Sequence, residues 1–102
     1  MSFQKFTRAR IIAIAALGVI SAAASAADGK AVYNVNCGMC HNAMSPKLGD
    51  KEAWAARIKL GNAALVSAVI KGKGSMPPRG GKKSLSDAEI QAAVGYLVSQ
   101  SQ

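Results

Sequence analysis

The sequence predicts an all-α domain, and three observations lead to that class. No stretch of useful length alternates apolar and polar residues as a half-buried strand would. Several short segments instead carry apolar residues at helical spacing and are bounded by capping or stop residues. Residues 72–84 contain four glycines and two prolines, so they cannot form a regular element. Three to five short helices joined by long loops are therefore expected.

Four helices can be placed along the chain from these boundaries. They cover residues 28–36, 51–60, 63–70 and a segment that begins near residue 87. Asp50 is suited to N-cap the second helix and Asn62 the third, and a glycine ends each of them. The last helix opens with a capping box formed by Ser86 and Glu89. Its apolar residues recur at helical spacing, at Ile90, Val94, Leu97 and Val98.

The first 26 residues differ in composition from the rest of the chain. A positively charged start is followed by an uncharged apolar stretch over residues 11–20 and then by small residues up to Ala26. This order is typical of a secretory signal peptide, with cleavage between Ala26 and Ala27. We therefore expect residues 1–26 to be a signal peptide and residues 27–102 to be the mature domain.

Cleavage changes what the composition means. The whole chain has 102 residues and a formal charge of +8, whereas residues 27–102 keep ten basic and five acidic residues, a charge of +5. A chain of this size buries only about 60% of its unfolded surface, so disulfides, a metal or a buried cofactor should supplement its core. The alternative to cleavage is a membrane anchor retained over residues 11–27, a stretch at the short limit of a spanning helix.

The segment Cys37-Gly38-Met39-Cys40-His41 contains both cysteines and the only histidine of the chain. It has the Cys-x-x-Cys-His form of covalent c-type haem attachment. Two thiols on one helical turn can each add to one vinyl group of a haem, and the imidazole that follows then lies under the iron as an axial ligand. Three other interpretations are weaker. A thioredoxin-like pair needs a βαβ context, a zinc site needs a fourth ligand, and a plain disulfide gives the histidine no role.

The second axial ligand has to be sought among the methionines, because no other histidine exists. Met39 lies inside the attachment turn, and Met44 follows His41 by only three residues, too few to reach the opposite face of the haem. Met76 follows His41 by 35 residues and precedes two prolines that restrict the backbone. The polar, glycine-rich loop around Met76 is a poor place for a methionine that only fills a core. Met76 is therefore the expected ligand, opposite His41.

With these residues the chain resembles the class I c-type cytochromes, and most of all the cytochrome c₅ group. The resemblance covers nearly all of residues 28–98. Besides the attachment motif it rests on Gly29-x-x-x-Tyr33, Pro46 to Lys51, Trp54-x-x-Arg57, Gly72 to Gly81, Leu85 to Glu89, and Tyr96-Leu97. It implies a small cytochrome c fold of three to five short helices wrapped around one covalently attached haem. Tyr33 and Tyr96 are expected where the first and last helices cross, with Gly29 permitting their close approach.

Three residues are expected to support the haem. A ligating histidine donates its other ring N–H to a fixed acceptor, which in class I cytochromes is usually a proline carbonyl shortly after the motif; Pro46 matches. Trp54 and Arg57 lie three residues apart on one helix face, and we expect them to donate to a haem propionate. The alternative is that Trp54 belongs to the core and Arg57 to the solvated surface.

The expected function is electron transfer rather than enzyme catalysis. An iron ligated by histidine and methionine has no open position, so no small-molecule substrate is expected. The resemblance implies a carrier in the periplasm of a bacterium that cycles Fe(III)/Fe(II) between respiratory redox partners. Two other classes remain open: a haem enzyme or gas sensor in which Met76 is labile, and an oxidase or reductase subunit tethered by residues 11–27.

Basic residues gather around the expected ligand loop, at Lys71, Lys73, Arg79, Lys82 and Lys83. Such a rim can steer docking, so the expected partners are redox proteins, in particular membrane oxidase or reductase complexes with acidic docking surfaces. The alternative is a solvated loop that its charge keeps in water. Nucleic-acid binding is not expected, because the chain is exported and carries no basic–aromatic stacking motif.

Overall fold

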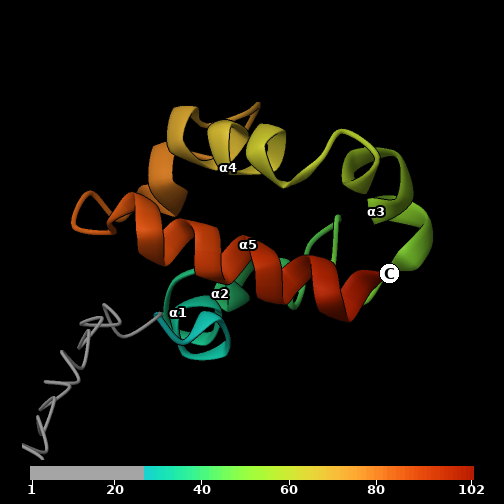
Figure 1. Cartoon of the computed structure of the whole chain (residues 1–102), viewed down its shortest axis with the longest axis horizontal. Coiled ribbons are helices and arrows are strands. Elements are labelled where there is room, and N and C mark those ends of the chain that lie inside the picture. The colour runs from blue at the N-terminus through green and yellow to red at the C-terminus, as the bar shows by residue number, and fades with distance from the viewer. Residues whose placement is uncertain (1–26) are drawn as a thin grey trace, which may run out of the picture.

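The computed structural model describes residues 27–102, where the regular structure is helical (Figure 1). The elements are α1 (Gly29–Asn36), α2 (Gly38–His41), α3 (Lys51–Ile58), α4 (Asn62–Lys71), the 3-10 turn η1 (Pro78–Gly81) and α5 (Asp87–Ser101). The β-type pairing found in this part of the chain is an isolated bridge between Lys73 and Met76. The all-α class predicted from the sequence is confirmed.

Two sequence predictions concern the N-terminal segment. The signal peptide predicted for residues 1–26 and the alternative anchor over residues 11–27 lie outside the described residues, apart from Ala27. From residue 27 onward, no single helix is long and apolar enough to cross a membrane. The pair α3 and α4 passes that test by length and composition when taken together, across a bend of 100°.

Three helices begin at side chains that satisfy their first backbone N–H groups. The carboxylate of Asp28 accepts from two N–H groups at the start of α1, and that of Asp50 accepts from one at the start of α3. At α5, the hydroxyl of Ser86 accepts from the N–H of Glu89, and the carboxylate of Glu89 accepts from the N–H of Ser86, each at 3.1 Å. The predicted cap at Asp50 and the predicted capping box are confirmed.

Two helix boundaries differ from the sequence prediction. α4 begins at Asn62 itself, and Gly61 takes the N-cap position that the sequence predicts for Asn62, with no side-chain cap. The chain turns between α3 and α4 through a φ of +89° at Gly61, which glycine adopts without steric cost, so the helix starts one residue early. α3 ends at Ile58 rather than at Leu60, because residues 59 and 60 already belong to this turn.

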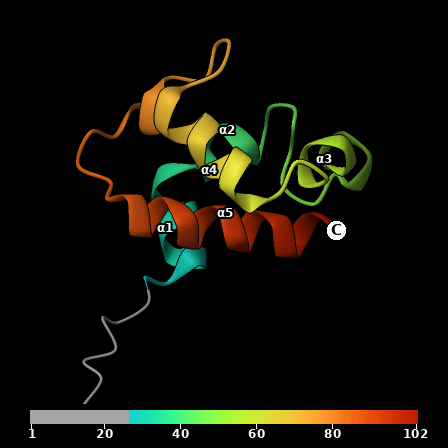
Figure 2. The same ribbon diagram turned by 45° about the horizontal axis from the view of Figure 1, so that its top comes forward.

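α5 is the central element, against which α1, α3 and α4 all pack (Figures 1 and 2). Its buried residues recur at helical spacing and form one stripe: Ile90, Ala93, Val94, Leu97, Val98 and Ser101. Ala93 and Leu97 join Tyr33 and Trp54 in one core cluster. The other apolar members join Leu85 in a second cluster, against which half-buried side chains of α4 pack. One helix therefore serves both halves of the core.

α1 and α5 cross at Gly29 with no room for a side chain. A Cβ at Gly29 would lie 2.2 Å from the carbonyl oxygen of Ala92. Beside this crossing the rings of Tyr33 and Tyr96 pack at 5.4 Å between centroids, tilted by 52°. The predicted crossing of the first and last helices is confirmed. Burial raises the pKa of the Tyr33 phenol, and the nearby Cys37 thiol and Tyr96 phenol contribute in the same direction.

We expect Gly29→Ala to lower the free energy of unfolding by about 1–3 kcal/mol, the usual effect of overpacking a close contact. Gly95→Ala is the matched control, because a Cβ at Gly95 on α5 meets nothing within 4 Å. The control should stabilise the protein by up to about 1 kcal/mol through helix propensity. Urea unfolding followed by circular dichroism measures both. A Gly29→Ala variant as stable as the control would contradict the close crossing.

Candidate haem site

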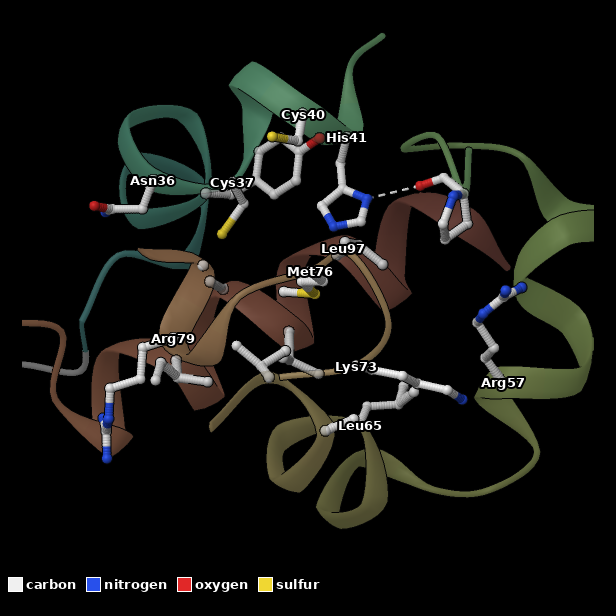
Figure 3. Close-up of a pocket in the computed structure, with 18 of the residues that line it drawn as sticks. Asn36, Cys37, Cys40, His41, Arg57, Leu65, Lys73, Met76, Arg79 and Leu97 are labelled. Atoms are coloured by element: carbon white, nitrogen blue, oxygen red, sulfur yellow. Dashed lines mark hydrogen bonds between the residues drawn. The ribbon is translucent and has the colours of Figure 1, made fainter. Parts of the chain in front are cut away.

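One helical turn presents both cysteines and the histidine. The backbone N–H groups of Cys40 and His41 donate to the same carbonyl, that of Cys37, at 3.3 and 3.0 Å. Cys37 is half-buried and Cys40 is exposed, and neither sulfur is in a disulfide. Burial raises the pKa of the free Cys37 thiol, and the neighbouring Cys40 adds to the shift. Figure 3 shows Cys37 and His41 directed from this turn toward the cavity beneath it.

The turn opens onto a cavity of about 450 Å³. All five α-helices and the loop over residues 73–80 line it, and the apolar contributions include Val32, Leu65, Val69, Ile90, Val94 and Leu97. α4 has a largely apolar sequence, yet none of its residues is buried, because its side chains border this cavity. Protein interiors hold few voids larger than a water molecule, so a cavity of this size in a small domain indicates a ligand site.

His41 has a fixed orientation at the cavity wall. Its Nδ1 lies 2.8 Å from the carbonyl oxygen of Pro46, the contact marked by the dashed line in Figure 3. Because a carbonyl oxygen can only accept, Nδ1 donates in this hydrogen bond and Nε2 keeps its lone pair. Figure 3 shows Met76 across the cavity from the imidazole. Metal-ligating histidines are held in this way, with the second nitrogen bonded to a fixed acceptor.

Met76 lies in a tight turn whose backbone conformation is restricted. The N–H of Met76 donates to the carbonyl of Lys73, and the N–H of Lys73 donates to the carbonyl of Met76, each at 3.0 Å. Gly72 enters the turn with a φ of +80°, and a Cβ there would lie 2.9 Å from the carbonyl oxygen of Met76. Both constraints fix the position from which the thioether reaches the cavity.

The three methionines between residues 27 and 102 have different surroundings. Met39 is 89% exposed and does not border the cavity. Met44 is 58% exposed and borders the cavity just after α2, where its N–H donates to the carbonyl of Cys40 at 2.7 Å. Met44 therefore follows directly on the turn that carries His41. Met76 is half-buried and comes from a different segment, which Figure 3 shows on the other side of the cavity.

Trp54 and Arg57 behave differently from one another. The indole N–H of Trp54 donates to the carbonyl of Lys47 at 2.8 Å, and the side chain belongs to a core cluster. An indole has a single donor, so the predicted hydrogen bond from Trp54 to a haem propionate is wrong, because the chain itself uses that donor. Arg57 is exposed and borders the cavity. Its guanidinium donates to the carbonyl of Ala53 and lies 5.9 Å from the centroid of the Trp54 ring.

The sequence assigns Lys73 and Arg79 only to a basic rim, and the structure gives each a more specific place. Lys73 borders the cavity and extends to the same side as Arg57 in Figure 3. Arg79 has a left-handed backbone, with a φ of +57°. Its guanidinium donates to the carbonyl of Leu85 and to the carboxylate of Asp87, each at 2.7 Å. Arg79 therefore ties the Met76 loop to the start of α5 and is not a free cation of the rim.

The side chains around the cavity fit one haem better than any other cofactor considered. Two thiols and an imidazole lie on one turn, a thioether approaches from another segment, and the walls between them are apolar. In the described part of the chain, no group of three or more His, Cys, Asp and Glu side chains could hold a bare metal ion, which disfavours the zinc interpretation. A thioredoxin-like pair lacks its βαβ context in an all-α domain.

Comparisons with known proteins point the same way. Residues 24–97 match the family model described as cytochrome c oxidase, cbb3-type, subunit III. Cytochrome c-555 of Chlorobaculum tepidum is 44% identical over 106 aligned positions, which cover 96% of this chain and 98% of that protein. Cytochrome c5 of Azotobacter vinelandii is 36% identical over 77 positions, which cover 71% of this chain and 93% of that protein.

Two solved structures share the fold. One comes from a crystal structure of an electron transfer complex of nitrite reductase with cytochrome c; it has a TM-score of 0.70 and 42% identity, covering 74% of this chain and 95% of that chain. The other is cytochrome c6 from the diatom Phaeodactylum tricornutum, with a TM-score of 0.58 and 30% identity, covering 72% of this chain and 91% of that chain.

We expect Gly72→Ala to lower the free energy of unfolding by more than Gly74→Ala. Both positions have a positive φ, a backbone conformation that costs a residue other than glycine about 1–3 kcal/mol. A Cβ at Gly72 also meets the backbone of Met76 and Pro78 within 3 Å, whereas one at Gly74 meets nothing within 4 Å. The crowded position should therefore lose roughly 1–3 kcal/mol more. Equal midpoints in urea unfolding would contradict a rigid Met76 turn.

Proposed function

Because the chain belongs to the class I c-type cytochromes, we propose that it is a periplasmic carrier that passes single electrons between respiratory partners through a haem iron ligated by His41 and Met76. Proteins of this family bind one covalently attached c-type haem and transfer electrons without being enzymes. The observation that carries the proposal is the placement of His41 and Met76 on two sides of one apolar cavity of about 450 Å³.

Four side chains would hold the haem. The thiols of Cys37 and Cys40 would form the thioether links, and His41 and Met76 would be the axial ligands. When bound, the haem supplies a one-electron Fe(III)/Fe(II) couple. The carbonyl of Pro46 holds the proton of His41 Nδ1, which leaves Nε2 as the ligating nitrogen.

The surroundings favour a moderately positive reduction potential. The thioether of Met76 is a soft, neutral donor that favours Fe(II) over Fe(III). The apolar side chains of α4 and α5 that line the cavity disfavour net charge there. With His41 and Met76 both bound to the iron, no position on it would remain open for a substrate. A carrier late in a respiratory chain fits these properties.

Arg57 remains the proposed partner of a haem propionate, and Lys73 joins it. Both are exposed, both border the cavity, and both extend to the same side of it (Figure 3). A carboxylate at this edge would receive charge-assisted hydrogen bonds that Trp54 cannot supply.

The proposed docking surface is the set of exposed lysines Lys71, Lys73, Lys82 and Lys83 around the Met76 loop. The only salt bridge found between residues 27 and 102 joins Arg79 and Asp87, so none of these four lysines is in an ion pair there. A cytochrome c similar to this chain forms an electron transfer complex with nitrite reductase, which supports a protein partner. We propose partners with acidic docking surfaces, in particular membrane oxidase or reductase complexes.

The proposed location is the bacterial periplasm, reached by export and cleavage between Ala26 and Ala27. The order of charged, apolar and small residues over residues 1–26 supports it. Retention of residues 11–27 as an anchor would place the same domain at the membrane surface, with the same site.

Met76→Ala should keep the covalent haem but lose the weak long-wavelength absorption band of methionine-ligated Fe(III). The reduction potential should fall by on the order of 0.1 V, a part of the roughly 0.8 V range that axial ligands control. Met44→Ala is the matched control, because Met44 borders the same cavity beside the turn of His41. It should keep both the band and the potential.

Carbon monoxide separates the carrier from a haem enzyme or gas sensor. The reduced wild-type protein should not respond to carbon monoxide at neutral pH, whereas reduced Met76→Ala should show a large change in its Soret band. A Soret change of the same size in the wild-type protein would contradict stable ligation by Met76.

Lys82→Gln/Lys83→Gln should slow electron transfer to an acidic redox partner several-fold at low ionic strength, because steering by charge contributes about tenfold or more to association. The difference from the wild-type protein should vanish in high salt. Lys30→Gln/Lys51→Gln, which removes two exposed lysines at the starts of α1 and α3, is the control. Equal slowing by both pairs would show that net charge alone matters.

A further inference from the structure

The loop over residues 43–49, between α2 and α3, carries the carbonyl that orients His41. Three hydrogen bonds of 2.8 Å hold the part of this loop that follows Pro46, and a fourth, from the N–H of Asp50 to the carbonyl of Lys47, measures 3.1 Å. The N–H of Leu48 donates to the carbonyl of His41, the indole N–H of Trp54 donates to the carbonyl of Lys47, and the N–H of Gly49 donates to the hydroxyl of Ser101. Two of the three come from other elements, Trp54 from α3 and Ser101 from the last turn of α5.

Both outside partners are shielded from water. Ser101 is 1% exposed, and Trp54 is 7% exposed. Losing the hydroxyl of Ser101 would leave the N–H of Gly49 without its acceptor in the protein. Gly49 has a φ of +83°, and a Cβ there would be in ordinary van der Waals contact with the carbonyl oxygen of Gln100, at 3.8 Å. The loop is thus seated against the end of α5.

We propose that Trp54 and Ser101 are positioning residues for the axial histidine: through Lys47 and Gly49 they fix the loop whose Pro46 carbonyl holds the ring of His41. The inference rests on the proposed function, because it concerns His41 as an iron ligand. It replaces the propionate contact predicted for Trp54 with a different role. It also gives a function to the buried hydroxyl of Ser101 at the C-terminal end of α5, 60 residues after His41.

The hydrogen bond from His41 Nδ1 to the Pro46 carbonyl would influence the reduction potential. A strong hydrogen bond from Nδ1 makes the imidazole a more basic ligand, which stabilises Fe(III) relative to Fe(II). A loop released at Lys47 or Gly49 would let the Pro46 carbonyl move away from His41. The imidazole would then donate less electron density, and the reduction potential would rise.

The experiment compares variants of the intact holoprotein. Ser101→Ala removes the acceptor of Gly49, and Ser101→Thr restores a hydroxyl at the same place. Trp54→Phe removes the indole N–H and keeps an aromatic ring in the core. Ser99→Ala is the control, because Ser99 lies on the same turn of α5 but is exposed and bonds only the carbonyl of Tyr96. Leu48 also packs against the core cluster and would help to hold the loop in each single variant. The double variant Ser101→Ala/Trp54→Phe therefore removes both hydrogen bonds from outside the loop at once.

Two quantities are measured: solvent exchange of the His41 Nδ1 proton by NMR in the reduced state, and the reduction potential. Each single variant should accelerate the exchange about twofold to tenfold, the factor that corresponds to one net hydrogen bond. The double variant should accelerate it further and raise the potential. Ser101→Thr and Ser99→Ala should match the wild-type protein. A merely structural role would change thermal stability and leave both quantities unchanged.

The outcomes separate this inference from the proposed function. Unchanged proton exchange and potential in the double variant, with haem attached and the methionine band intact, would overturn the inference alone. A wild-type protein that lacks the methionine band would overturn the proposed ligand set and this inference with it. If Trp54→Phe fails to fold, Ser101→Ala and its rescue by Ser101→Thr decide the result.

Discussion

The apolar face of α4 borders a cavity instead of another helix, and the rest of the structure depends on what fills that cavity. The second core cluster, on α5, also opens onto it through Ile90 and Val94. The domain formed by residues 27–102 is too small to close this space with its own side chains. One covalently attached haem, as in the rest of the family, adds the missing apolar mass. The cofactor is then part of the core as well as the site of electron transfer.

The two proposed iron ligands reach the cavity by different means. His41 comes from a helical turn, and the loop that follows this turn orients its ring through Pro46. Met76 comes from a tight turn that Gly72 and a pair of backbone hydrogen bonds hold in place. Local backbone geometry therefore fixes both side chains in position before an iron binds. Contacts at the two ends of α5 brace both segments: Leu85 just before the helix and Asp87 at its start hold the Met76 segment, and Ser101 at its end holds the Pro46 loop.

The features that the sequence predicts correctly depend on local interactions. The capping box at Ser86 and the cap at Asp50 involve neighbours three residues apart, and the crossing at Gly29 follows from a motif. The propionate contact predicted for Trp54 was wrong, because the path of the loop over residues 43–49 brings the carbonyl of Lys47 to the indole N–H. The sequence does not predict the left-handed backbone of Arg79 or its bonds to Leu85 and Asp87, because these partners become neighbours only after the chain has folded back. The cap predicted at Asn62 was displaced by the turn at Gly61.

The most direct test of the central claim compares the holoprotein with a Cys37→Ala/Cys40→Ala chain produced without haem, using near-UV circular dichroism and thermal unfolding. We predict that the holoprotein has fixed aromatic signals from Tyr33, Trp54 and Tyr96 and unfolds cooperatively. The haem-free chain should retain helical far-UV signal but lose the near-UV signal and the cooperative transition. A haem-free chain that unfolds cooperatively at the same midpoint as the holoprotein would contradict the account.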